Sequence, residues 1–201
     1  LLESVDNLTL SISVTTRPRR HSEVDTVHYH FITQAAFEEL RTRGELLESA
    51  AVHGNYYATP RQPVIQALEQ GRDVLFDIDW QGTRQLKAAM GGDVVGIFVL
   101  PPSMKELRQR LERRAEDAGD VFARRLANAR TEIGHLEQDD YVLINRDLQD
   151  SYNAARAILE AERARRRNPL ALVPDEVRAL ERVNQPGLKA FVARLLAEPD
   201  A

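Results

Sequence analysis

The 201-residue chain contains no cysteine. This absence excludes disulfide bonds, a thiolate nucleophile and a cysteine-ligated zinc site. No apolar run is long enough to span a membrane, and the sequence has no internal repeat or low-complexity segment. Positive charge is not in excess, because 27 Lys and Arg residues face 31 Asp and Glu residues, for a formal net charge of −4. We therefore expect a cytoplasmic protein that binds neither membranes nor nucleic acid, with homo-oligomer formation left open.

The sequence does contain an alternation of short strand-like segments and amphipathic helical segments. The apolar segments are typical of buried parallel strands, and the helices are expected to cover both faces of the sheet. The pattern predicts an α/β fold. Strands are expected from Leu10 up to Arg17 and at 28–32, 45–52, 55–59, 73–79, 94–100 and 141–145, and helices at 33–44, 63–71, after Ser103, at 149–167 and twice beyond Pro169.

The first predicted strand runs directly into a cluster of positive charge. In the stretch LSISVTTRPRR, the β-branched residues favour an extended backbone, and Arg17, Arg19 and Arg20 follow at once. The strand therefore delivers guanidinium groups to a sheet edge or cleft mouth. Because the arginine fork matches planar oxyanions, a phosphate or a carboxylate is the expected guest, and a solvated turn is the alternative.

Two acids end the apolar run DVLFDID. Ligands of open parallel sheets bind beyond the carboxyl ends of the strands, which is where Asp77 and Asp79 would lie. Two carboxylates projecting to one side of a strand could orient a hydrated magnesium ion or accept hydrogen bonds from a base. The alternative is that an acid here caps the helix starting near Gln81.

A second group of arginines lies in the segment RQRLERRAEDAGDVFARRL. Arg110 and Arg114 are four residues apart on one helical face, and Arg125 lies on the next helix. Arginines of this kind often serve only the solubility of an exposed helix. Two arginine groups with strand-end acids between them, however, suit a site that holds a polyanion and offsets its charge, as phosphoryl transfer requires.

A resemblance to guanylate kinase is carried by five segments, in the family's order and spacing between Leu1 and Arg167: SISVTTRPRRHSEVDTVHYHF, LLESAAVHGNYYAT, FDIDWQG, LPPSMKELRQRLERR and VLINRDL. The resemblance implies a P-loop kinase fold that moves the γ-phosphoryl group of Mg·ATP to GMP, giving GDP and ADP in purine nucleotide metabolism. It also implies three parts: a core at 1–15, 68–109 and 129–167, a GMP-binding subdomain at 16–67 and a helical lid at 110–128. Residues 168–201 lie beyond the resemblance and are expected to form a helical extension.

The resemblance also assigns roles to residues. Glu48 would read guanine, because a carboxylate accepts from both donors of that base and faces an acceptor in adenine; we expect it in a cleft open to solvent. Asp77 would contact the magnesium ion indirectly, through a water molecule. The guanine contacts would be Ser13, Glu48, Thr59 and Asp79; the GMP phosphate contacts would be Arg17, Arg20, Tyr29 and Tyr57; and Arg110, Arg114 and Arg125 would hold the ATP phosphates and, with Arg17, be catalytic.

The chain departs from the family pattern at several points. Ser22 and Thr26 stand where glycines are usual, and no phosphate-binding loop of the form G-x-x-x-x-G-K-[ST] occurs in the 201 residues. The family places that loop one helix before the position of Leu1. We expect the loop to lie upstream of this sequence, and the alternative is a binding module related to guanylate kinase that lacks ATP chemistry.

Overall fold

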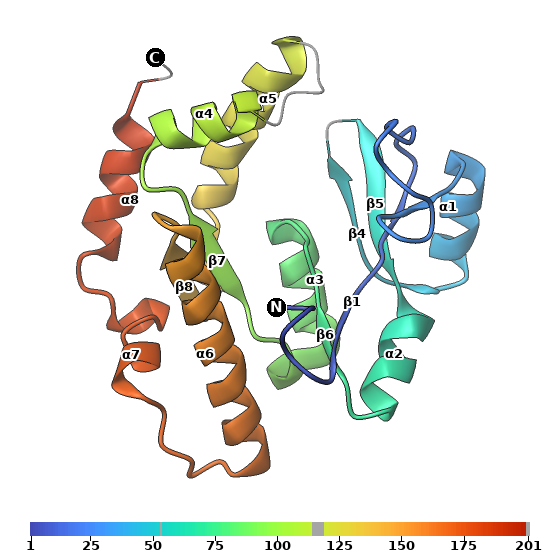
Figure 1. Ribbon diagram of the computed structural model, residues 1–201. Coiled ribbons are helices and arrows are strands. Elements are labelled where there is room, and N and C mark those ends of the chain that lie inside the picture. Colours follow the sequence, from blue (N-terminus) through green and yellow to red (C-terminus); the bar gives the residue numbers. More distant parts are fainter. Residues whose placement is uncertain (53, 114–118, 200–201) are drawn as a thin grey trace. The chain divides into compact units, whose positions relative to one another are not determined.

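Figure 1 shows the computed structural model of the chain, which describes residues 1–52, 54–113 and 119–199. The chain forms two compact units, Leu1–Val94 and Val95–Ala201. Each unit contains a pair of parallel strands with helices around it, so the predicted α/β class is confirmed. No helix in the described ranges combines the length and the apolar character that crossing a bilayer requires.

The first unit contains two sheets. A two-stranded parallel sheet consists of β1 (Leu8–Leu10) and β6 (Asp73–Leu75). A four-stranded sheet has the order β3 (His30–Phe31), β2 (Val14–Thr15), β5 (Asn55–Pro60) and β4 (Leu46–Val52), in which β2 runs parallel to β3 and the other pairs are antiparallel. The predicted strands at 28–32, 45–52 and 55–59 are therefore present, and the turn residue His53 between the last two lies outside the described residues.

The single strand predicted from Leu10 is two short strands in different sheets. The Ser11 N–H still donates to the Leu75 carbonyl of β6, at 2.9 Å, whereas the Ser13 carbonyl already accepts from His30 N–H of β3, also at 2.9 Å. Three residues thus carry the chain from one sheet to the other. The β-branched run favours an extended backbone throughout, but each half pairs with a different partner, and this pairing is not visible in local sequence.

Three helices complete the first unit: α1 (Gln34–Thr42), α2 (Arg61–Glu69) and α3 (Trp80–Met90). Thr33 caps α1, since its side-chain oxygen accepts the Ala36 N–H at 3.2 Å. Asp79 caps α3 by accepting the Gly82 N–H at 2.9 Å, and the strand predicted to reach Asp79 already ends at Leu75. The expectation of two acids alternating along a strand is therefore wrong, and the helix-capping alternative is confirmed for Asp79.

The second unit has its own parallel pair and helical cover. The strands are β7 (Ile97–Leu100) and β8 (Tyr141–Ile144), and the helices are α4 (Met104–Arg113), α5 (Gly119–Ile133), α6 (Leu148–Arg167), α7 (Asp175–Arg178) and α8 (Leu188–Ala197). Residues beyond α7 pair with β8, because Val142 N–H donates to the Leu180 carbonyl at 3.0 Å and Arg182 N–H to the Asp140 carbonyl at 2.8 Å. The two helices predicted beyond Pro169 are thus present and attached to the core of the unit.

The end of α2 provides a test of the local backbone. Gly71 has φ +70°, and a side chain there would meet only open space. Gly71→Ala should therefore lower the free energy of unfolding by about 1 kcal/mol, because an L side chain at positive φ is strained. Gly92→Ala in the same unit is the matched control, since Gly92 also faces open space but lacks the positive φ. Urea titrations that gave equal stability for both variants would contradict the claim that the positive φ of Gly71 makes a side chain there costly.

Candidate functional site

Arg17, just after β2, is held by a largely buried network. Its Nε–H donates to the Tyr57 hydroxyl at 3.1 Å, and its two terminal nitrogens donate to Glu23 at 3.0 and 2.5 Å. The side chains of this ion pair are only 14% and 11% exposed. The guanidinium also lies over the rings of Tyr29 and Phe31, at 5.6 and 5.8 Å from the ring centroids. A bidentate pair flanked by aromatic rings fixes the cation in one orientation.

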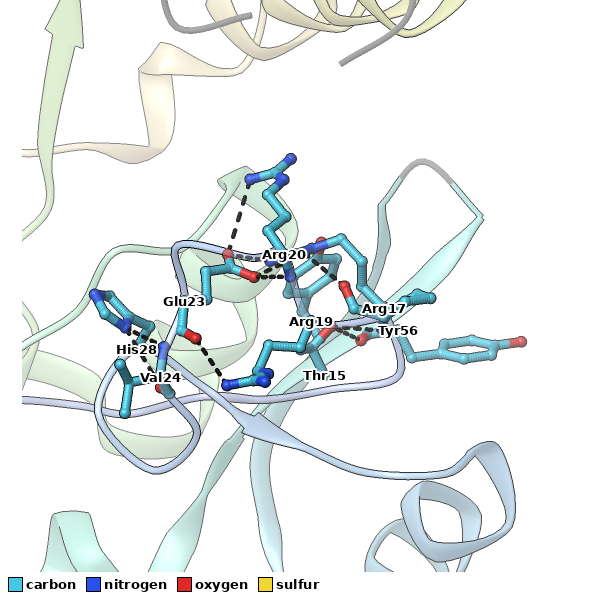
Figure 2. A network of polar contacts seen from close by, with 10 residues as sticks. Thr15, Arg17, Arg19, Arg20, Glu23, Val24, His28 and Tyr56 are labelled. Carbon is cyan, nitrogen blue, oxygen red and sulfur yellow. Dashed lines mark hydrogen bonds and ion pairs between the residues drawn. The ribbon is translucent and has the colours of Figure 1, made fainter. Parts of the chain in front are cut away.

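Glu23 organises the whole loop, as Figure 2 shows. Besides Arg17, it accepts the backbone N–H of Arg20 at 2.7 Å, and its carboxylate lies 3.8 Å from the Arg20 guanidinium. Arg19 donates to the Glu23 carbonyl at 3.1 Å. The hydrogen bond from Arg17 holds the pKa of Glu23 below its ordinary value. The motifs assigned no role to Glu23, although it lies only six residues from Arg17 in the same loop.

The two tyrosines predicted to bind phosphate lie beside this cation. The rings of Tyr29 and Tyr57 meet edge to face, with centroids 5.9 Å apart. Burial raises the pKa of Tyr29, and the Tyr57 hydroxyl and the Asp77 carboxylate raise it further. Tyr29 is therefore a neutral donor at physiological pH. The structure thus brings together Arg17, Arg20, Tyr29 and Tyr57. Asp77 is near enough for its charge to raise the pKa of Tyr29.

Thr26 confirms one departure noted in the sequence. It adopts φ +66°, the left-handed region that glycine accepts freely and β-branched residues rarely adopt. Its N–H donates to the Tyr29 carbonyl at 2.8 Å, so the strained residue closes the turn that presents Tyr29. Thr26 thus adopts a backbone conformation that favours glycine.

Glu48 on β4 is the second centre of the site. It is paired with Thr59 of β5 in the sheet register, and the Thr59 hydroxyl donates to Glu48 Oε1 at 2.7 Å. Glu48 is only 4% exposed, so the expectation of a cleft open to solvent is wrong for this side chain. Burial raises the pKa of Glu48, and the charge of Asp79 raises it further. Glu48, Thr59 and Asp79 thus lie close to one another.

The first turn of α3 closes over Glu48. A Cβ atom on Gly82 would lie 2.8 Å from Glu48 Oε2 and 3.2 Å from its Cδ, so any side chain there would have to displace the Glu48 carboxylate. The segment FDIDWQG contains this glycine, but nothing local indicated that Glu48, 34 positions earlier, would be its neighbour. Ser13, the remaining predicted guanine contact, lies in the Ser11–Ser13 connection, and the described contacts join only its carbonyl to His30.

The predicted ATP-side arginines belong to the second unit. Arg110 on α4 donates from Nε to Glu106 at 2.9 Å and from Nη2 to the Asn145 carbonyl at 3.0 Å, beyond the carboxyl end of β8. Arg125 is half-buried on α5. Arg114 lies outside the described residues. In the described part of the chain, no group of three or more His, Asp or Glu side chains could enclose a metal ion. A single acid such as Asp77 fits a magnesium ion that keeps most of its water ligands.

The ion pair of Glu23 predicts a pH dependence of stability. Because the folded state lowers the pKa of this carboxyl, its stabilisation is present above about pH 4.5 and is lost as the pH falls through the lowered value. Glu23→Gln should cost about 1–3 kcal/mol of unfolding free energy near pH 7 and much less at acid pH. Glu39→Gln is the control, because its pair with Arg43 is exposed and should contribute little. A loss for Glu23→Gln that does not change with pH would contradict the assignment.

Comparison with known proteins identifies the family. The sequence model of guanylate kinase matches residues 1–162. The chain is 58% identical over 166 residues to guanylate kinase of Rhizobium etli, covering 83% of this chain and 76% of that protein. It is 54% identical over 198 residues to guanylate kinase of Mesorhizobium japonicum, covering 98% and 84%. A crystal structure of guanylate kinase from Anaplasma phagocytophilum superimposes with a TM-score of 0.69 at 32% identity, covering 96% of this chain and 88% of that one. The chain belongs to the guanylate kinase family.

Proposed function

We propose that this protein is a GMP kinase that transfers the γ-phosphoryl group of ATP to GMP, giving GDP and ADP in cytoplasmic purine metabolism. One observation carries the proposal: Tyr57 and Thr59 are two residues apart on β5 and face the same side of the sheet. Tyr57 belongs to the arginine cluster and Thr59 to the Glu48 pair. Two residues of a strand span about 6.6 Å, so one nucleotide can reach an oxyanion site and a base site together.

Glu48 would read the base. Guanine presents two donors on one edge, N1–H and the 2-amino group, and an ionised carboxylate accepts both. The hydrogen bond from Thr59 fixes the carboxylate plane before the base arrives, at 2.7 Å. Adenine offers an acceptor at the same place and would leave a buried carboxylate without its partners, which is costly. Ser13 and Asp79 would complete the base site.

The arginine cluster would hold the GMP phosphate. Arg17 is oriented by Glu23, Arg20 lies on the same loop, and Tyr29 and Tyr57 add donors without adding charge. A phosphate oxygen of GMP is already ionised near pH 7, so the reaction needs no general base. Positioning and offsetting of charge would supply the catalysis, with Arg17, Arg110, Arg114 and Arg125 as the catalytic cations.

The proposal also covers the binding of ATP, which donates the phosphoryl group, and the subdomains of the chain. Residues 16–67 would form the GMP-binding subdomain and 110–128 the lid over the ATP phosphates. Magnesium would enter with ATP, and Asp77 would orient it through a bound water molecule. The metal would offset charge on the transferred phosphoryl group. Substrates are therefore small molecules, and no nucleic acid or membrane takes part.

Steady-state kinetics of the full-length gene product with GMP, AMP and CMP test the function. Glu48→Gln replaces an acceptor with a donor that opposes a guanine N–H, so kcat/KM for GMP should fall about tenfold to a hundredfold, a cost of about 1–3 kcal/mol. Glu45→Gln is the matched control, because Glu45 is exposed and precedes the same strand. Unchanged use of GMP by Glu48→Gln would remove Glu48 as the guanine reader. GMP binding without any phosphoryl transfer by the parent would instead indicate a binding module.

Gly82 offers a second test of the base site. Gly82→Ala places a methyl group 2.8 Å from Glu48 Oε2, which forces the carboxylate out of position. We expect KM for GMP to rise about tenfold or more, with kcat at saturating GMP changed less, because the change acts on ground-state binding. Gly92→Ala is the control for the added methyl group. Parent-like KM for GMP in Gly82→Ala would show that Glu48 is not held by this contact.

A further inference from the structure

The residues after Asn168 are not used by the proposed mechanism, yet the last helix contacts both helices that flank residues 114–118. Figure 1 shows the carboxyl end of α8 beside the start of α4 within the second unit. The buried side chains Leu188 and Leu195 of α8 belong to one apolar cluster with Met104 of α4 and Leu126 of α5. The cluster alone makes α8 part of the unit's core, and the polar contacts at its carboxyl end are more specific.

Glu198, immediately after α8, caps α4. Its Oε2 accepts the N–H of Met104, the first residue of α4, at 2.7 Å. The Ser103 hydroxyl accepts the Glu106 N–H at 3.0 Å, so two of the N–H groups left open at this helix start are satisfied. A carboxylate at a helix N-terminus is also favoured by the helix dipole. The residue that starts α4 is therefore fixed by a side chain 94 positions away.

Arg130, in the last turn of α5, binds the same end of α8. Its guanidinium donates to the carbonyl of Leu196 and, at 2.5 Å, to the carbonyl of Glu198. These carbonyls lie at the helix end, where no intrahelical donor remains, and a cation there complements the dipole. The main chain at Glu198 thus binds α5 while its side chain binds α4.

We propose that Glu198 and Arg130 are positioning residues. Glu198 holds the first residue of α4, and Arg130 joins the last turn of α5 to the end of α8. These contacts, called the clamp below, set the geometry of the arginines that α4 and α5 carry. The inference rests on the proposed function, because it assigns those arginines to the ATP phosphates. Arg110 lies six residues along α4 from the capped N–H and is itself held by Glu106 and the Asn145 carbonyl. Loss of the clamp lets the two helices shift, which affects the transition state more than GMP binding.

The test uses Glu198→Ala and Arg130→Ala in the full-length gene product. We expect kcat to fall about threefold to thirtyfold in each, with KM for GMP within about twofold of the parent. Glu198→Gln should retain most of kcat, because its amide oxygen still accepts the Met104 N–H. Glu176→Ala and Arg194→Ala are the controls, since both side chains are exposed on neighbouring helices of the same region.

A second measurement separates the clamp from the proposed function. Amide hydrogen exchange should be faster than in the parent in the first turn of α4 in Glu198→Ala, which loses the bond to Met104, and in the last turn of α5 in Arg130→Ala, which loses the bonds to the end of α8. Parent-like kcat in both alanine variants, or a loss explained entirely by a smaller folded fraction, would overturn the positioning role. If the parent protein does not phosphorylate GMP, the proposed function is wrong but the clamp can still be judged by hydrogen exchange. If exchange in the variants is also unchanged, the clamp is wrong as well.

Discussion

The proposed base site depends on a buried carboxylate. Glu48 is almost fully removed from solvent, and a charge in that environment is costly unless it is hydrogen-bonded. The hairpin of β4 and β5 supplies one donor from Thr59, and the first turn of α3 closes the other side through a glycine that leaves room for the carboxylate. A partner with two adjacent donors would satisfy the remaining lone pairs, and this is the basis of our proposal that Glu48 reads guanine.

At the proposed phosphate site the roles are reversed, because there an acid, Glu23, holds the arginines in place. Arg17 would repel Arg20 and sample many rotamers if it stood alone. Glu23 binds both arginines and fixes Arg17 beside two aromatic rings. An arriving phosphate would then find a cation in one orientation, with less ordering entropy to lose on binding. The tyrosines add donors without increasing the repulsion.

Local features of the fold could be predicted from the sequence. Thr33 and Gly44 bound α1 as expected, the hairpin around Gly54 pairs as expected, and the motifs led to the correct family. These features depend on neighbours within a few residues. The same reasoning joined β1 and β2 into one strand, because extended propensity does not reveal which sheet each half pairs with.

Contacts between distant residues were missed for a related reason. The approach of Gly82 to Glu48 and the two contacts of Glu198 join positions that only the tertiary fold brings together. Glu23 is different, because its spacing from Arg17 is short and an acid beside an arginine cluster could have been recognised as its partner. The burial of Glu48 also required the fold, since the sequence around it does not distinguish a buried acid from one in an open cleft.

The comparison of GMP with IMP as ligands of the 201-residue chain tests the central claim most directly. IMP has the same phosphate and N1–H but lacks the 2-amino donor, so only the base contact to the buried carboxylate changes. Calorimetry should give a dissociation constant for IMP about tenfold to a hundredfold weaker than for GMP, from a loss of about 1–3 kcal/mol. Equal affinities for the two nucleotides would contradict the account, because the Glu48 carboxylate would then not be reading the guanine edge.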